Sequence, residues 1–231
     1  MSRVIDKLVN IGNERLSGKY FSDDRRDYLF EYFEGSNVVV SAHRDTICDY
    51  VNAVASVWGK NEPLYVGVNM LYDSVFGRLD NTIGVAIIDG LKEEFGNKLS
   101  YLKTNYEEVG GKGADKFCRD FKNILGDVLI VNFDISDDDY LNRKDGIGLV
   151  AYSYDTTPEF VVDMIKAREV EILKPRFNDS FVFEDYGIKT VSFHVQIEQM
   201  HGVVEYARVE KVIRAFDIIR DFVKELLDKT Y

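Results

Sequence analysis

The chain contains few cysteines, few prolines and no long apolar run, and each scarcity excludes a class of protein. Two of its 231 residues are Cys, at positions 48 and 118, which is too few for a disulfide framework or a thiolate zinc site. Three prolines and no Gly/Ser-rich linker offer no boundary, so we expect one domain over residues 1–231. No apolar run matches a membrane span, and residues 1–18 lack the apolar core of a signal peptide. We therefore expect a cytoplasmic protein without a membrane partner.

Positive charge is also scarce. Lys and Arg number 29 against 40 Asp and Glu, which gives a formal net charge of -11. Such a chain repels nucleic acid and anionic membranes, so we expect neither as a partner. Most of these acids belong to a solvated surface, but the excess also suits a protein that binds cations. The apolar fraction of 45% supports a proper core.

Short apolar runs alternate along the chain with segments of helical period. The pattern predicts strands at 37–42, 63–71, 99–106, 127–133, 146–153 and 189–195. It predicts helices at 3–16, 22–35, 81–95, 112–125, 157–168 and 209–228. This alternation favours an α/β fold, a three-layer α/β/α arrangement around a mostly parallel mixed sheet. In such sheets, ligands bind beyond the carboxyl ends of the strands.

Metal-binding residue types stand where those strands end or a helix begins. They are His43, Asp80, Glu107, Glu108, Asp134 and His201. One carboxylate after a strand is ordinarily a polar loop residue, and a lone histidine is more often structural. Together, however, two of the chain's three histidines and several carboxylates fit a two-ion site with one bridging carboxylate. Zinc is the default ion, and cobalt or manganese fits the same ligands.

Six segments carry a resemblance to a known group. In chain order they are SAHRDT (41–46), GRLDNTIGVAI (77–87), NYEEVGGKGA (105–114), VNFDIS (131–136), FNDSFVFEDYGIKTVSF (177–193) and QMHGVVEYA (199–207). These segments resemble the motifs of the co-catalytic dinuclear zinc exopeptidases, which include leucyl, tetrahedral and glutamyl aminopeptidases. The Glu-Glu and Met-His segments are the most specific. The resemblance implies a zinc-exopeptidase-like fold and an aminopeptidase that hydrolyses the N-terminal peptide bond of a peptide.

The resemblance also implies a set of metal ligands. Asp80 would bridge two divalent ions, and the remaining ligands would be His43, Glu108, Asp134 and His201. Which of the two acids shares an ion with His43 stays open. The resemblance further implies a cis peptide bond after Asp80.

Two further residues receive catalytic roles from the same resemblance. Glu107 would be the general base that deprotonates the metal-bridging water and passes the proton to the leaving amine. Asp45 would hydrogen-bond His43 and fix the tautomer of its imidazole ring.

The spacing of the motifs is shorter than in the group. Asp80 follows His43 by 37 residues, and His201 follows Asp134 by 67 residues. Neither interval can hold the insertion or lid domain of the larger relatives, so we expect a single, minimal catalytic domain. Because the insertion drives shell-like assembly, we predict a monomer or a small homo-oligomer.

Alternatives stay open for the function and for three neighbouring features. A carboxypeptidase or amide deacylase could use the same dinuclear core, and a non-catalytic binding protein could keep the same fold. We expect His194 to be a strand histidine near the site and Asp179 to order the pocket. Residues 137–139, all Asp, form either a solvated loop or an attractor for a substrate ammonium group.

Overall fold

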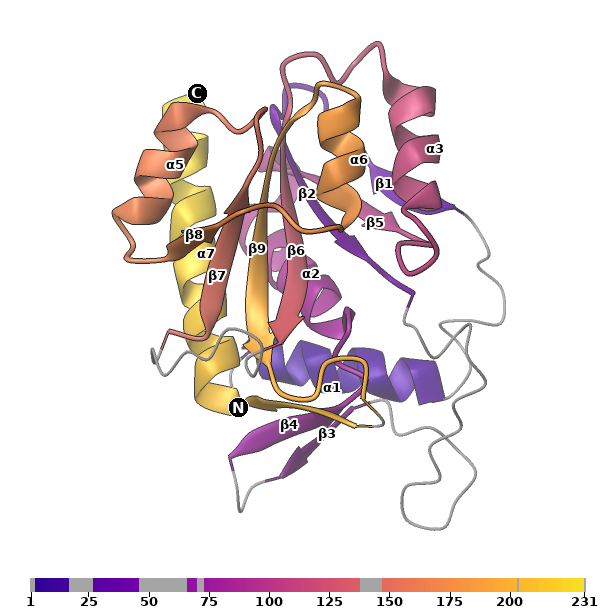
Figure 1. The fold of residues 1–231 in the computed structure, drawn as a ribbon, viewed down its shortest axis with the longest axis vertical. Helices are drawn as coiled ribbons and strands as arrows, with labels where there is room; N and C mark the ends of the chain where they lie inside the picture. The colour runs from indigo at the N-terminus through magenta and orange to yellow at the C-terminus, as the bar shows by residue number, and fades with distance from the viewer. Residues whose placement is uncertain are drawn as a thin grey trace.

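A seven-stranded mixed sheet forms the centre of the protein (Figure 1). The computed structural model describes residues 3–16, 27–45, 66–69, 73–137, 147–202 and 204–230. Across the sheet the order is β1 (Tyr28–Glu31), β5 (Ser100–Thr104), β2 (Val38–His43), β6 (Leu129–Asp137), β9 (Lys189–Ile197), β7 (Leu149–Ser153) and β8 (Glu171–Leu173). The β1–β5 and β9–β7 pairings are antiparallel, and the other pairings are parallel. The predicted α/β fold with a mostly parallel mixed sheet is confirmed.

Helices cover both faces of this sheet. The helices α2 (Thr82–Phe95), α5 (Glu159–Lys166) and α7 (Val209–Thr230) share one apolar core with it, and α3 (Lys112–Phe121) and α6 (Asp179–Asp185) share another on the opposite face. The helix α1 (Arg3–Leu16) packs against α2 and α7, below the arrowheads of β6 and β9 (Figure 1). Every residue of β6 but the last is buried, as expected for a strand covered on both faces.

A second, antiparallel sheet lies beside α1. It has the order β10 (Glu205–Arg208), β4 (Ser74–Gly77), β3 (Val66–Asn69). The strand predicted at 63–71 contributes β3 to this sheet rather than to the central one, and its other residues lie outside the described part. The small sheet matters for function because β4 leads into Asp80 and β10 follows His201.

The helix predicted at 22–35 is wrong. Residues 28–31 form the edge strand β1, while residues 22–26 lie outside the described part. A capping residue followed by acids predicted a helix here, but pairing with β5 is the stronger influence. In this pairing Tyr28 lies opposite Thr104. The alternate side chains Tyr28 and Phe30 pack on the ring of Phe117 from α3, at 5.6 and 4.9 Å between centroids. An apolar face with a period of two residues is what a strand provides.

The other predicted helices are present, with ends that differ by a few residues. Asn81 caps α2 through its side chain, which accepts a hydrogen bond from the Gly84 amide at 2.9 Å. The sequence did not indicate β1, β4, β8, β10 or α6 as regular elements. The Asp80–Asn81 peptide bond is cis. None of the helices in the described part of the chain combines the length and apolar character that a bilayer span requires.

Candidate metal centre

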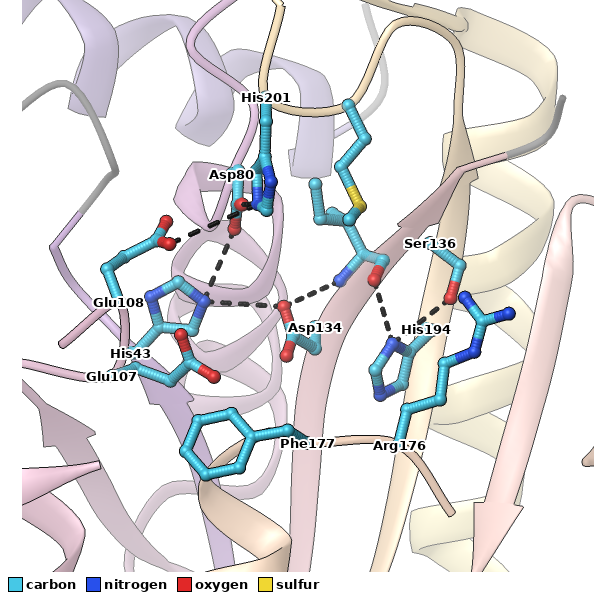
Figure 2. Close-up of a pocket in the computed structure, with 12 residues that line it drawn as sticks. His43, Asp80, Glu107, Glu108, Asp134, Ser136, Arg176, Phe177, His194 and His201 are labelled. Carbon is cyan, nitrogen blue, oxygen red and sulfur yellow. Dashed lines mark hydrogen bonds and ion pairs between the residues drawn. The ribbon is translucent and has the colours of Figure 1, made fainter. Parts of the chain in front are cut away.

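The structure brings all six metal-centre candidates into one cavity of about 200 Å³ at the carboxyl edge of the central sheet (Figure 2). His43 is the last residue of β2, and Glu107 and Glu108 form the turn after β5. Asp134 lies within β6 rather than after it, because this strand continues to residue 137. Asp80 precedes α2, and His201 lies in the turn before β10. Residues far apart in sequence meet here because parallel strands end at one edge.

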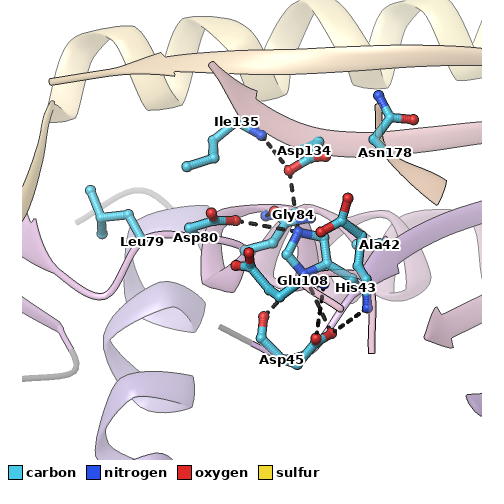
Figure 3. Close-up of polar contacts among 12 residues, drawn as sticks. Ala42, His43, Asp45, Leu79, Asp80, Gly84, Glu108, Asp134, Ile135 and Asn178 are labelled. Carbon is cyan, nitrogen blue, oxygen red and sulfur yellow. Dashed lines mark hydrogen bonds and ion pairs between the residues drawn. The ribbon is translucent and has the colours of Figure 1, made fainter. Parts of the chain in front are cut away.

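His43 is buried with one ring nitrogen committed to the backbone (Figure 3). Its Nδ1 lies 3.0 Å from the carbonyl oxygen of Asp45, which can only accept, so Nδ1 carries the proton. Its Nε2 then faces Asp80 Oδ1 and Asp134 Oδ1, both at 3.3 Å. Against the effect of burial, Asp134, Asp45 and Asp80 raise the pKa of His43, which favours a second proton on this nitrogen, and a metal ion between the side chains would replace that proton. The ring is therefore oriented as a metal ligand.

Asp80 lies between two histidines. Its Oδ1 faces His43, and its Oδ2 lies 3.0 Å from Nε2 of His201. Glu108 Oε2 lies 4.0 Å from the same nitrogen of His201. Ligand atoms of His43, Asp80 and Glu108 all lie within 4.8 Å of one another. One carboxylate between two imidazoles is the arrangement that a bridging ligand needs.

Asp45 supports both the histidine and the glutamate turn. Its carboxylate lies 3.6 Å from Nδ1 of His43, farther than its own carbonyl oxygen. The same carboxylate accepts hydrogen bonds from the amides of Glu107 and Glu108, at 3.3 and 3.2 Å. Asp45 therefore fixes the position of the turn as well as the orientation of the ring.

Glu205, in β10, is a site residue that the sequence analysis left without a role. Its Oε2 accepts hydrogen bonds from the amides of Leu79 and Asp80, at 2.7 and 2.9 Å, and its Oε1 accepts one from the amide of His201 at 2.8 Å. One buried carboxylate thus holds two candidate ligands by their backbone. The sequence could have indicated this residue, because Glu205 follows His201 by four residues in the Met-His segment.

The electrostatics of the cavity fit a bound cation. Burial raises the pKa of Glu107 to about 9; the charge of His43 opposes this shift and that of Asp134 adds to it. Burial, with the charge of Asp80, raises the pKa of Glu108 to about 8. Carboxylates crowded in a buried site repel one another, and a divalent ion removes that cost.

Two buried oxygen atoms without a hydrogen-bond partner also indicate a cation site. Among the described residues, Asp80 Oδ1 and Glu108 Oε1 are buried side-chain atoms without a hydrogen-bond partner. Buried polar atoms are rarely left in this state. The donor set, imidazole nitrogen with carboxylate oxygen, is the one that zinc accepts. The residues present therefore fit divalent metal ions.

Two further candidates border this centre. Asp179, at the start of α6, is buried and accepts a hydrogen bond from the hydroxyl of Thr104. Burial raises the pKa of Asp179 to about 7. His194 lies in β9 opposite Asp134 and also lines the cavity. Of the three expected acids at 137–139, Asp137 ends β6 and the other two lie outside the described residues.

Comparison with known proteins finds similarity in structure alone. No family model matches the chain, and no curated protein matches its sequence. The aminopeptidase APDkam598 of the archaeon Desulfurococcus kamchatkensis matches with a TM-score of 0.63 and 11% identity, over 96% of this chain and 90% of that one. The fold is shared. The TET1 peptidase of Pyrococcus horikoshii can assemble into a tetrahedron or a large octahedral shell. It matches with a TM-score of 0.62 and 15% identity, over 94% of this chain and 98% of that one.

A third similar structure is a zinc enzyme. It is BSAP, a zinc aminopeptidase from Bacillus subtilis, with a TM-score of 0.58 and 14% identity, over 86% of this chain and 49% of that one. At these identities the likeness shows a common fold of aminopeptidases, while activity must be argued from the site itself.

Proposed function

We propose that this chain is a dinuclear metal-dependent aminopeptidase that hydrolyses the N-terminal peptide bond of peptides. One observation carries the proposal: the two oxygens of Asp80 each face the Nε2 atom of a different histidine, His43 at 3.3 Å and His201 at 3.0 Å. Glu108 and Asp134 would complete the two ligand sets. The aminopeptidase fold of the similar structures supports this assignment.

The residues of the chain divide the chemistry between them. Bound divalent ions would supply Lewis acidity, which polarises a carbonyl group and lowers the pKa of water. Glu107 lines the cavity beside His43 and would accept the proton of the attacking water, then donate it to the leaving amine (Figure 2). Asp45 and Glu205 would keep the ligands and the base in place through the hydrogen bonds described above.

The proposal is tested by metal analysis together with Glu107→Gln. The wild type should contain divalent metal and cleave aminoacyl-anilides. Glu107→Gln should lower kcat by about 10²–10⁴-fold at unchanged metal content, because general-base catalysis contributes that much. Glu159→Gln, at the exposed start of α5, is a matched control that should keep the wild-type rate.

Two results would contradict the proposal. One is a wild type that binds no divalent metal, and the other is a Glu107→Gln variant with the wild-type rate. A panel that adds N-acyl amino acids and C-terminally varied peptides separates this activity from amide deacylation and carboxypeptidase action.

A further inference from the structure

The cavity has two chemically different ends (Figure 2). At one end stand the acids and histidines of the proposed metal centre. Ser136, Arg176 and His194 stand at the other, across Asp134, with Arg176 rising from the loop between β8 and α6. Among the cavity-lining residues that the structure describes, Arg176 is the single Lys or Arg. A guanidinium group therefore faces a site that is otherwise rich in carboxylates.

His194 adds no charge at that end. Its Nδ1 lies 2.8 Å from the carbonyl oxygen of Ile135, which can only accept, so Nδ1 carries the proton. Its Nε2 then accepts hydrogen bonds from Ser192 Oγ at 2.9 Å and Asn178 Nδ2 at 3.1 Å. Burial lowers the pKa of His194. The ring is a neutral, fully bonded part of the wall, and the guanidinium of Arg176 supplies the positive charge.

Ser136 adds a hydroxyl to the same wall. Its Oγ lies 3.2 Å from both Nδ1 of His194 and the hydroxyl of Tyr152. Because it can accept from each, it can direct its own proton to a ligand. A guanidinium beside such a hydroxyl matches a carboxylate, which a planar fork of N–H donors binds in bidentate fashion.

We propose that Arg176, with Ser136, binds a carboxylate of the substrate and selects peptides that carry one close to the cleaved bond. The proposal rests on the aminopeptidase function above and names its substrate class. The loaded metal centre would hold the carbonyl group of the cleaved bond and Arg176 the carboxylate, so the two ends orient the peptide along the cavity. At about 200 Å³ the cavity is below the ~300–1,000 Å³ of drug-sized sites, which suits the end of a short peptide.

A carboxylate at this position can come from two sources. It is either the side chain of an N-terminal Asp or Glu, or the C-terminal carboxylate of a dipeptide. Two substrate pairs distinguish the sources on the zinc-loaded protein. Glutamyl-p-nitroanilide against glutaminyl-p-nitroanilide tests the side chain, and alanyl-alanine against alanyl-alanine amide tests the C-terminus.

The measured quantity is the ratio of kcat/KM within each pair. In the wild type, one pair should favour its carboxylate member by about 10- to 100-fold, the usual effect of a hydrogen bond to a charged group. Arg176→Gln should reduce that ratio to within about 3-fold of unity, and Arg176→Glu should reverse it. Arg119→Gln, which removes an exposed charge from α3, is the matched control and should keep the wild-type ratio.

Two results would overturn the proposal: ratios near unity in both wild-type pairs, or a preference that persists in Arg176→Gln. Cleavage of other aminoacyl-anilides but of neither pair would also overturn it. If the wild type cleaves no aminoacyl-anilide and neither pair, the aminopeptidase function fails, and calorimetry decides the carboxylate site by itself. Zinc-loaded wild type should then bind L-glutamate more tightly than L-glutamine, or alanyl-alanine more tightly than its amide, and Arg176→Gln should lose the difference. Equal binding within both pairs would refute the site.

Discussion

At the scale of single residues, the centre depends on a carboxylate that would touch neither metal nor substrate. Glu205 accepts hydrogen bonds from the backbone amides of Leu79, Asp80 and His201. Burial raises the pKa of Glu205 to about 7, and once this carboxyl group is ionised each of these hydrogen bonds ends on a charged oxygen, which makes it stronger than a neutral one. The distance between Asp80 and His201 is therefore set largely by one side chain on β10.

Replacing Glu205 by Gln should weaken metal binding. The amide group keeps one acceptor oxygen and presents a donor to backbone N–H groups, so one of the two candidate ligands loses its support. We expect a loss of about 10- to 100-fold in zinc affinity, the usual effect of removing a supporting partner of a ligand. Competition with a chromophoric chelator measures it.

The control for this change is Glu210→Gln. Glu210 is an exposed acid in the first turn of α7 and pairs with Arg208 at 3.7 Å. It should bind zinc as the wild type does. Unchanged zinc affinity in Glu205→Gln would show that the backbone holds Asp80 and His201 without this carboxylate.

At the scale of elements, glycines shape the turn between β5 and α3 that places the glutamates, and the helix start that follows it. Gly110 and Gly111 have φ of 100° and 65°, which glycine adopts without strain. A Cβ on Gly113 would lie 2.2 Å from the carbonyl oxygens of both Asn105 and Asp27. The start of α3 is thereby packed directly on the backbone that follows β5, next to Glu107.

Gly113→Ala should therefore unfold more easily than the wild type. Two backbone oxygens must move to admit the methyl group, and such overpacking costs about 1–3 kcal/mol or more. Chemical denaturation measures the loss. Gly126→Ala, where an added Cβ meets nothing within 4 Å, is the matched control and should stay within about 1 kcal/mol of the wild type. Equal stability of both variants would contradict the tight contact.

At the scale of the whole molecule, the folded chain concentrates buried acids that the unfolded chain keeps apart. Burial raises the pKa of Glu107, Glu108 and Asp179 above their usual range, so ionising these carboxyl groups in the metal-free centre carries a cost. Divalent ions that bind the folded state alone would relieve it.

Zinc should raise the thermal midpoint of the metal-free protein, and a chelator should lower it again. At a thousandfold excess over Kd the gain is about 4 kcal/mol, or ~10 °C for a chain of this size. Differential scanning calorimetry measures it. Asp80→Asn should abolish most of the rise because it removes the bridging charge. A thermal midpoint that does not change when zinc is added would contradict a metal centre.

The assembly state is a second prediction at this scale. The resemblance drawn from the sequence implies an assembly-driving insertion between His43 and Asp80, and because the 37 residues there cannot hold it, a monomer or small oligomer stays our prediction. Light scattering that shows a dodecamer would contradict it.

Local sequence patterns predicted many of the helices and strands. The wrong prediction at β1 has its cause in contacts with distant parts of the chain. The run at 127–133 and the period at 209–228 indicated β6 and α7, because burial on both faces or on one stripe leaves a direct record in sequence. The local sequence around β1 is misleading, because Ser22, the acids after it and Gly35 together are typical of a capped helix. Pairing with β5 and stacking on α3 decided otherwise, and both partners lie more than 70 residues away.

The sequence by itself determined the identities of the candidate ligands and the sheet edge at which they gather, because side-chain chemistry and the ends of buried strands are local properties. The tertiary structure alone decided that Glu205 braces Asp80 and His201, that Asp45 holds the glutamate turn, and that Arg176 faces the same cavity. These placements depend on how β10, β2 and the loop before α6 converge. Convergence of distant segments is fixed by packing, which spacing along the chain does not encode.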